Sequence, residues 1–277
     1  MDSGSTQMIR SLGRMLCRHR RNPLIRRINK SIVALHKATE NLSYDVRLNG
    51  ELWVLQRVAS SARISTVFDV GANKGDWSKV ALQTFPKSEI HAFEVGPATF
   101  MELERSVGHE EAMTLNSCGL SNMEGTLAMH VDPRFPVLAT SVPGFSQRFH
   151  GYDPATAQLP VTTGDAYCVK KGIEHIGFLK IDVEGHEPNV LKGFEGMLGR
   201  GSIDIIQFEY GYINIDTGFL LKHFHEYLEA FDMRVGKIFP NHVEFREYRH
   251  LHEDFYGPNF LAVHSNLSNV IRELAGR

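Results

Sequence analysis

The sequence is poor in the features that mark membrane-spanning, exported and disulfide-bonded proteins. No apolar run approaches the roughly 20 residues of a membrane-spanning helix, and the N-terminus lacks the apolar core of a secretory signal. Only three cysteines occur, at Cys17, Cys118 and Cys168, widely spaced and without a CxxC pair. Such a set argues against a disulfide framework or a zinc site. We therefore expect a soluble protein of the cytoplasm.

Acidic residues are scarce near the N-terminus only. Residues 1–50 hold ten Lys/Arg and three Asp/Glu, whereas the rest of the chain holds twenty and twenty-nine. Ile25, Ile28 and Ile32 recur at helical spacing among basic residues, which predicts a basic helical extension. The extension could pack on the main domain or on a second subunit, or residues 1–40 could contact an anionic membrane surface. Aromatic residues are not interleaved with the basic ones, so we expect no nucleic-acid partner.

Residues 51–277 alternate short apolar runs with segments of helical periodicity, as expected for one α/β domain. Runs rich in β-branched and aromatic residues predict strands at 65–71, 89–95, 112–118, 176–183 and 203–210. Helical spacing of apolar residues predicts helices at about 77–85, 190–198 and 219–231. Because the strands are apolar on both faces, they predict a mostly parallel, doubly wound sheet. Residues 234–239 and 259–265 would close it as an antiparallel edge.

Residues 121–163 interrupt this alternation. They are crowded with proline, glycine and polar residues, although 125–131 could form a strand. Long irregular insertions in compact domains usually have a function or are disordered. We predict an irregular insertion that forms a lid or one wall of an acceptor site.

The stretch "VFDVGANKGDW" (67–77) joins a predicted strand to a predicted helix through a glycine-bearing turn. Gly71 permits a sharp turn, Asn73 tolerates positive φ, and Gly75 lets helix and strand approach closely. Ligands of open α/β sheets bind beyond the carboxyl ends of the strands, where this turn lies. Glu94 ends the next strand, in a position to take two ribose hydroxyls. The stretch therefore predicts a site for a nucleoside-containing cofactor.

The glycine pattern separates the candidate cofactors. A P-loop is excluded, because no GxxxxGK[ST] occurs, and the run from Gly71, G-A-N-K-G, does not match the GxGxxG of dinucleotide sites. Asp69, Gly71, Asn73 and Gly75 instead follow the Asp-x-Gly-x-Gly-x-Gly form of S-adenosylmethionine sites, with Asn at the middle glycine. Asp69 could order the loop and favour a cationic ligand.

Four segments together resemble the FkbM-type family of S-adenosylmethionine-dependent methyltransferases: "FDVGANKGDW", "HAFEVGPATF", "FLKIDVEGHEPNVLKG" and "IIQFEYG". The resemblance covers roughly residues 60–265 and leaves residues 1–50 outside it. One departure is Val95-Gly96, where many members have Glu-Pro-x-Pro. The resemblance implies a Rossmann-like class I methyltransferase, usually an O-methyltransferase acting on sugars, polyketide-like metabolites or lipid-linked glycans. It further implies that Asn116 and Leu120 lie near the adenine.

The stretch "LKIDVEGHE" (179–187) is a second candidate for chemistry. Asp182 falls near the carboxyl end of its strand, where a carboxylate could bind the methionine amino group or the acceptor hydroxyl. An alcohol acceptor loses a proton during methyl transfer, so a general base helps. His186 is the first candidate for the base because of its ordinary pKa, with Asp182 second. The alternative for His186 is a polar residue at a helix start that faces solvent.

Further residues could shape the acceptor pocket or hold a metal. Glu184, Glu209 and Tyr210 are candidates to line the acceptor pocket, because they follow the ends of neighbouring strands. The alternative for Tyr210, which the sequence favours, is packing in the core. Asp182, Glu184, His186 and Glu187 could also bind a divalent cation, since carboxylates and imidazole suit Mg²⁺ or Mn²⁺. Placing all four on one ion is awkward across a strand-to-helix bend. A metal is therefore possible but not favoured, and no metal site is predicted.

The sequence leaves three functions open. The favoured one is S-adenosylmethionine-dependent methyltransfer to a hydroxyl of a sugar, glycan or small metabolite. The second is a non-catalytic scaffold that binds the cofactor and docks through its basic N-terminal helix. The third is a nicotinamide-dependent oxidoreductase, which the missing third glycine disfavours.

Overall fold

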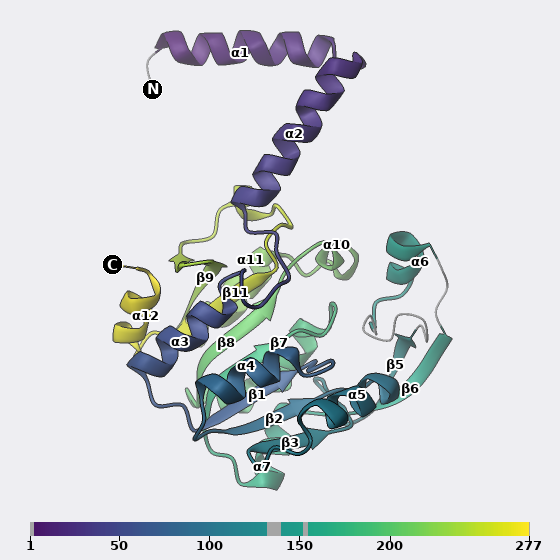
Figure 1. The fold of residues 1–277 in the computed structure, drawn as a ribbon, viewed down its shortest axis with the longest axis vertical. Coiled ribbons are helices and arrows are strands. Elements are labelled where there is room, and N and C mark those ends of the chain that lie inside the picture. The colour runs from purple at the N-terminus through teal and green to yellow at the C-terminus, as the bar shows by residue number, and fades with distance from the viewer. Residues whose placement is uncertain (1–2, 132–139, 152–154, 277) are drawn as a thin grey trace.

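The computed structural model describes residues 3–131, 140–151 and 155–276, and its centre is an eight-stranded sheet (Figure 1). The strand order is β10-β9-β11-β8-β7-β1-β2-β3. The strands are β1 (Thr66–Val70), β2 (Glu89–Phe93), β3 (Met113–Asn116), β7 (Ile176–Ile181), β8 (Ile203–Glu209), β9 (Met233–Phe239), β10 (His242–Phe245) and β11 (Asn259–His264). β1, β2, β3, β7 and β8 are parallel, whereas β11, β9 and β10 form antiparallel pairs at one edge. The predicted sheet is confirmed, and β10 is an edge strand that the prediction lacks.

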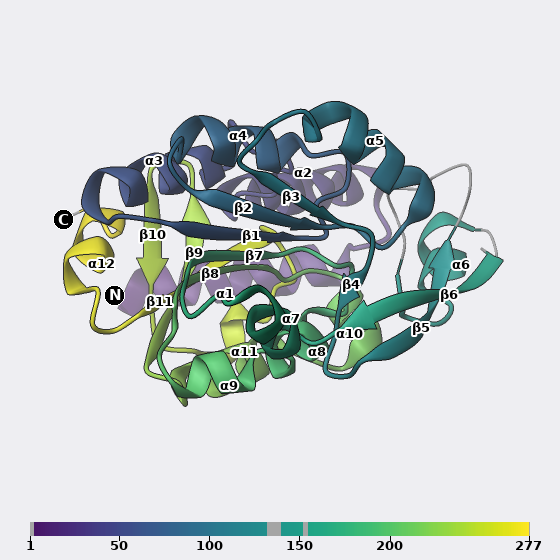
Figure 2. The same cartoon turned by 90° about the horizontal axis from the view of Figure 1, so that it is seen from below.

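Helices cover both faces of this sheet (Figure 2). One layer contains α3 (Glu51–Ser61), α4 (Asp76–Thr84), α5 (Pro97–Val107) and α12 (Ser268–Leu274). The other contains α7 (Gly164–Lys171), α8 (Glu187–Lys192), α9 (Glu195–Gly199) and α11 (Leu221–Glu229). Short α10 (Ile213–Thr217) and the 3₁₀ helix η2 (His250–His252) lie in connections. Each layer has its own apolar core against the sheet, which explains why the parallel strands are apolar on both faces.

The single helix expected over 190–198 is two helices, α8 and α9. The break follows from Asp165, whose carboxylate accepts hydrogen bonds from Gly196 N at 2.7 Å and Met197 N at 2.9 Å. A carboxylate that satisfies free N–H groups at a helix start acts as a cap. The backbone N–H of Asp165 also donates to Gly193 O at 2.9 Å, which fixes the turn between the two helices.

The insertion at 121–163 is more regular than expected. It forms β5 (Gly125–Val131) and β6 (Ala155–Thr162), which pair antiparallel, and the short helix α6 (Phe145–His150). With β4 (Gly119–Leu120) they make a second, three-stranded sheet of order β4-β6-β5. Pro160 is tolerated because β4 pairs with β6 only from Val161 onward, which leaves Pro160 on a free edge. Residues 132–139 and 152–154 of the insertion lie outside the described residues.

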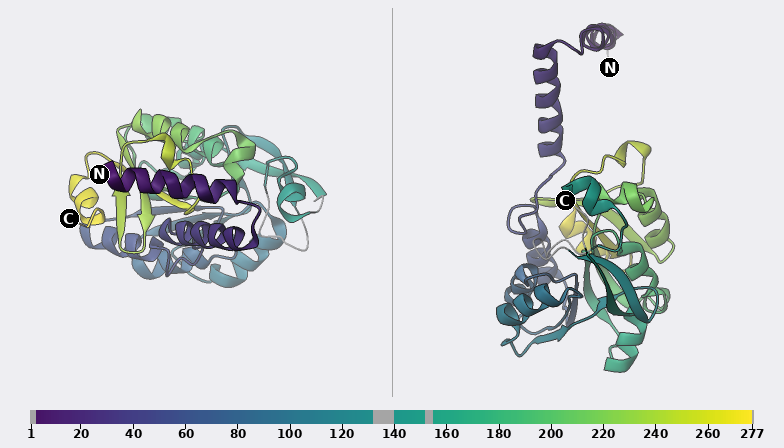
Figure 3. Two further views of the ribbon diagram at one scale, coloured as in Figure 1. Left: turned by 90° about the horizontal axis from the view of Figure 1, so that it is seen from above. Right: turned by 90° about the vertical axis from the view of Figure 1, so that its right-hand side faces the viewer.

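The predicted N-terminal helices are α1 (Ser3–Arg18) and α2 (Pro23–Thr39), which project from the body (Figures 1 and 3). α2 buries none of its residues, so the chain's own body does not cover it as one interpretation of the sequence expected. Its C-terminal end is held by Lys237, whose ammonium lies 2.6 Å from Glu40 Oε2. Within the described ranges, no helix is both long and apolar enough to cross a membrane.

Candidate active site

The glycine-bearing turn lies where the carboxyl ends of three parallel strands meet. β1 pairs with β2 and with β7, so that Val70 lies opposite both Phe93 and Ile181. The backbone N–H of Gly71 donates to Phe93 O, and that of Asp182 donates to Val70 O, each at 2.9 Å. Gly71 has φ +84°, and a Cβ there would lie 1.8 Å from the carbonyl oxygen of Asp182. Only glycine fits this contact, which brings both sequence motifs to one place.

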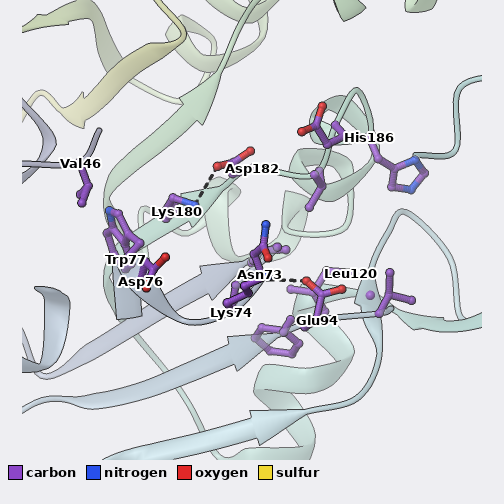
Figure 4. A pocket seen from close by; sticks show the side chains of 18 of the residues that line it. Val46, Asn73, Lys74, Asp76, Trp77, Glu94, Leu120, Lys180, Asp182 and His186 are labelled. Carbon is purple, nitrogen blue, oxygen red and sulfur yellow. Dashed lines mark hydrogen bonds and ion pairs between the residues drawn. The ribbon is translucent and has the colours of Figure 1, made fainter. Parts of the chain in front are cut away.

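Glu94 fixes the turn from the end of β2 (Figure 4). Its Oε2 accepts a hydrogen bond from Asn73 N at 3.0 Å, and its Oε1 accepts one from Gly96 N at 2.7 Å. Burial raises the pKa of the Glu94 carboxyl, against these two hydrogen bonds. Each oxygen keeps lone-pair capacity for a ligand. Asn73 has φ +49°, and its buried Oδ1 has no hydrogen-bond partner within the described part of the chain.

A cavity of about 730 Å³ opens above these strand ends. Seven of the predicted site residues line it: Gly71, Asn73, Glu94, Leu120, Asp182, Glu184 and His186. Leu127, Met129 and Val161 of the insertion form part of its wall. The predicted role of the insertion at an acceptor site stays a prediction. The volume lies within the range of roughly 300–1,000 Å³ typical of small-molecule sites.

A chain of charges runs from the interior to the cavity, in which Lys180 and Asp69 are buried and the Asp182 side chain is 40% exposed. Lys180 Nζ is 3.0 Å from Asp182 Oδ2 and 3.6 Å from Asp69 Oδ1, and Ser78 Oγ donates to Asp69 Oδ2 at 2.6 Å. Burial opposes the charge of Lys180, but its acidic neighbours outweigh burial and raise its pKa. Burial likewise opposes ionisation of Asp182, and Lys180 outweighs it and lowers that pKa. Asp182 is therefore a carboxylate that faces the cavity.

Three residues predicted to bind the cofactor do not line the cavity. Asp69 is fully buried and acts through Lys180 and Ser78, so it supports the turn from below. Gly75, with φ +85°, begins α4, and a Cβ there would meet the Leu103 side chain at 2.9 Å. Asn116 differs most from its predicted role beside the adenine. Its side-chain amide donates to Ala92 O and Thr114 O, which ties it to the strands instead.

His186 is buried, so its interpretation as a solvent-facing residue is wrong. Its Nε2 lies 2.9 Å from Ser121 Oγ and its Nδ1 3.0 Å from Ser141 Oγ. Burial lowers the pKa of the His186 imidazole to about 4. The ring is therefore neutral near pH 7, and it is a weaker proton acceptor than its ordinary pKa suggests. The structure removes the reason for which His186 was the first candidate for the base.

Carboxylates gather beside Asp182. Burial, followed by repulsion from Asp182 and Glu187, raises the pKa of Glu184 to about 8. Burial also raises the pKa of Glu187 to about 7 and that of Glu209 well above its usual range. Oxygen atoms of Asp182, Glu184 and Glu209 lie within 4.8 Å of one another, a spacing that one cation could bridge. This set differs from the four residues that the sequence suggested as a possible but unfavoured cation site, because it contains Glu209 and lacks His186 and Glu187.

A second hollow, of about 250 Å³, adjoins the cavity. It is lined by the predicted acceptor residues Glu184, Glu209 and Tyr210, and by Tyr44, Tyr212 and Phe255 among others. Tyr210 is fully buried; its ring stacks on Phe255 and its hydroxyl donates to Glu253. Glu184 and Tyr44 line both the cavity and this hollow. These two side chains therefore stand at the junction between the two spaces.

Several residues at the cavity were not among the predicted ones. Lys180 does carry a signal in the sequence, since a lysine inside the apolar run "FLKIDV" has to be paired when it is buried. Glu51 is buried beside it, held by Asn49 Nδ2 and Gln207 Nε2, each at 2.6 Å. Residues 44–47 also line the cavity. They lie between the extension and the domain in the sequence, where no motif indicated that they reach the site.

The sheet order, the glycine turn after β1 and the acid after β2 define a Rossmann-like domain of the class I methyltransferase type. The family model described as the Methyltransferase FkbM domain matches residues 69–236, and the chain belongs to this family. The resemblance found in the sequence is thereby confirmed.

Curated relatives match about half of this chain. Methyltransferase sdnD of Sordaria araneosa is 30% identical over 157 residues, which cover 47% of this chain and 60% of that protein. The 31-O-demethyl-FK506 methyltransferase FkbM of Streptomyces tacrolimicus is 33% identical over 153 residues, with 47% and 59% covered. The 2-O-methyltransferase NoeI of Sinorhizobium fredii is 24% identical over 136 residues, with 46% and 56% covered. The aligned part thus spans about 60% of the length of these relatives.

Among solved structures, the chain is similar to Methyltransferase FkbM from Methylobacillus flagellatus KT. The TM-score is 0.46 at 15% sequence identity, over 72% of this chain and 43% of that one. The plantazolicin methyltransferase BpumL gives a TM-score of 0.43 at 10% identity, over 88% and 91%.

Proposed function

We propose that the chain uses S-adenosylmethionine to methylate a hydroxyl group of a sugar-like or other polyhydroxylated acceptor. The cavity fits the cofactor in three respects. Glu94 offers two oxygens to ribose hydroxyls, the unpaired Oδ1 of Asn73 is an acceptor, and the Asp182 carboxylate suits a cationic amino group. Phe93, Leu120 and Val161 supply an apolar wall.

Each residue has a separable role in this proposal. Bound S-adenosylmethionine would supply an activated methyl group, and the protein would align it with the acceptor and exclude water. Glu94 would hold the ribose, and Asp182 the amino group. Lys180 keeps Asp182 ionised, and Asp69 with Ser78 keeps Lys180 in place. The buried charges are thus positioning groups for the cavity floor.

One observation carries the choice of acceptor chemistry: Glu184 lines both the cavity and the adjoining hollow. A general base has to reach the acceptor hydroxyl next to the donor, and a group at this junction would be within reach of both spaces. A carboxylate whose pKa is about 8 is matched to accept a proton near neutral pH. We therefore assign the base to Glu184 in place of His186. Two relatives whose names specify methylation at oxygen support an alcohol acceptor.

The hollow favours an acceptor with several hydroxyls. Its lining combines the aromatic residues Tyr44, Tyr212 and Phe255 with the acidic residues Glu184 and Glu209. Aromatic faces suit the C–H face of a sugar ring, and carboxylates accept hydrogen bonds from hydroxyls. At about 250 Å³ the hollow would take one ring or a similar group of a larger acceptor.

Calorimetry followed by turnover tests the proposal. We expect saturable binding of S-adenosylmethionine and S-adenosylhomocysteine and none of NADH, which serves as the control for the nicotinamide alternative. A panel of sugars and other polyols should then contain an acceptor that is methylated at oxygen, also in the presence of EDTA. Loss of turnover in EDTA that Mg²⁺ restores would assign the carboxylates to a cation. Cofactor binding without turnover on any acceptor would favour the non-catalytic scaffold instead.

A further inference from the structure

The α1–α2 pair, residues 3–39, carries charge of one sign only. It contains nine Lys/Arg and no Asp/Glu, whereas residues 51–277 have an excess of nine acidic residues. A dense positive charge on an acidic body indicates an anionic partner for the pair.

Each helix has separate apolar and basic faces. In α1, Met8, Leu12 and Met15 share one side and are exposed, while Arg10 and Arg14 lie on the opposite side. In α2, Leu24, Ile28, Ile32 and Leu35 share one side, again exposed, and Arg26, Lys30 and Lys37 lie opposite. Leu35 is 67% exposed and Met8 is 70% exposed, far above what a residue of a buried face retains.

The body does not cover these faces. Figure 3 shows α2 extending away from the sheet and α1 lying across the far end of α2. Among the described residues, the contacts to the body lie at the end of α2: Glu40 pairs with the buried Lys237, and the His36 ring contacts the Tyr256 ring edge-on at 5.5 Å. The Asn41 side chain also donates to Ile238 O at 2.9 Å. The pair is therefore attached at its base and open along its length.

We propose that the α1–α2 pair docks on the surface of an anionic lipid bilayer. Basic amphipathic helices with this division of faces lie in the membrane interface, with the apolar face in the acyl boundary and Lys/Arg at the headgroups. A second copy of the chain is the other candidate to cover the apolar faces. If the α1–α2 pairs of two copies covered each other, nine positive charges would meet nine more with no acidic residue in either pair to offset them. Docking on the acidic body of a second copy is an outcome that the test below distinguishes.

Docking would bring the candidate active site to the membrane. The chain that leaves α2 continues directly into Tyr44, Asp45 and Arg47, which line the cavity. An anionic surface would repel the acidic body and attract the α1–α2 pair. The pair would therefore determine which side of the molecule faces the membrane. The docking proposal does not depend on the proposed methyl transfer, and its test uses no turnover.

Sedimentation of the full chain with vesicles tests the proposal. At about 0.1 M salt, where charges act over about 10 Å, we expect binding to phosphatidylserine-containing vesicles and little to pure phosphatidylcholine. Binding should fall at least tenfold in two variants: Arg10→Gln/Arg14→Gln/Arg18→Gln, and Leu12→Gln/Met15→Gln/Ile28→Gln/Ile32→Gln. The matched control, Arg63→Gln/Lys87→Gln/Arg105→Gln, removes three exposed charges of the body and should change it less than twofold.

Thermal unfolding of each variant, expected to match the parent chain, shows that the body is intact. Equal binding to neutral and anionic vesicles, or binding that the charge variant leaves unchanged, would overturn the proposal. A chain that does not bind vesicles and sediments as a dimer would also overturn the proposal, if the apolar variant dissociates that dimer. A second copy of the chain, and not a bilayer, would then cover the apolar faces.

Discussion

Lys180 Nζ lies 3.0 Å from Asp182 Oδ2 and 3.6 Å from Asp69 Oδ1, so one buried cation joins the two sequence motifs of the site. Asp69 belongs to the strand before the glycine turn, and Asp182 follows the adjacent strand. The ammonium thus compensates two carboxylates, one beneath the cavity and one facing it. Stability and the proposed cofactor binding therefore involve the same three charges.

Lys180→Met should therefore lower both stability and cofactor affinity. Removing one partner of a buried ion pair leaves uncompensated charge, which costs about 3–5 kcal/mol. Denaturant unfolding near pH 7 should show a loss of that order. Lys222→Met is the control, because Lys222 forms an exposed pair with Glu226 at 3.3 Å; it should cost less than about 1 kcal/mol. Equal losses in the two variants would contradict the account.

Gly71→Ala should unfold the turn or the whole domain. The new Cβ would occupy the place of the Asp182 carbonyl oxygen, and φ +84° is unfavourable for alanine. We expect a loss of more than about 2 kcal/mol, because both strain and overlap contribute, and no detectable binding of S-adenosylhomocysteine. Gly199→Ala, where a Cβ meets nothing within 4 Å, should leave both properties unchanged. A Gly71→Ala protein as stable as the parent chain would show that residue 71 does not approach the carbonyl oxygen of Asp182 as closely as described.

The pH dependence of methyl transfer distinguishes the two candidate bases. With Glu184 as base, the rate should rise with pH and level off above about 8, since the carboxylate form is the active one. With His186 as base, the inflection would lie near 4. Glu184→Gln should lower kcat by about 10²–10⁴, while His186→Gln should keep the inflection near 8. An inflection that vanishes only in His186→Gln would return the role to His186.

Glu187→Gln should flatten the pH dependence of stability. In the folded chain the pKa of the Glu187 carboxyl is raised from 4.5 to about 7, so the folded state binds the proton more tightly. That stability is complete below 4.5 and lost as the pH rises through 7. Between about pH 5 and pH 8 the variant should lose about 1–3 kcal/mol less free energy of unfolding than the parent chain. Parallel curves from urea unfolding would contradict this.

The sequence predicted the parts of the site that depend on strand order. Gly71, Glu94 and Asp182 were placed together because strand ends in a parallel sheet meet at one edge, and this is confirmed. Asn116 also stands at a strand end, but its amide bonds to backbone carbonyls, a choice that periodicity does not encode. Tyr44 reaches the cavity because the residues before the domain pass beside it. No local sequence pattern predicts that path.

The shifts of the pKa values likewise could not be predicted from the sequence. Burial moves the pKa of His186 and that of Glu184 in opposite directions, because it disfavours a cation in one and an anion in the other. These opposite shifts are the reason that the base we propose is Glu184 and not His186. The split between α8 and α9 has the same origin, since Asp165 caps the second helix from 31 residues away.

The most direct measurement is a calorimetric titration of S-adenosylhomocysteine into the parent chain, Glu94→Gln and Glu89→Gln side by side. Glu89 begins the strand that Glu94 follows and is exposed, so it is the matched control. The account predicts one saturable site, at least tenfold weaker in Glu94→Gln because a charged hydrogen-bond acceptor contributes about 1.5–3 kcal/mol, and unchanged in Glu89→Gln. Absence of binding to the parent chain, or equal affinity in all three proteins, would contradict it.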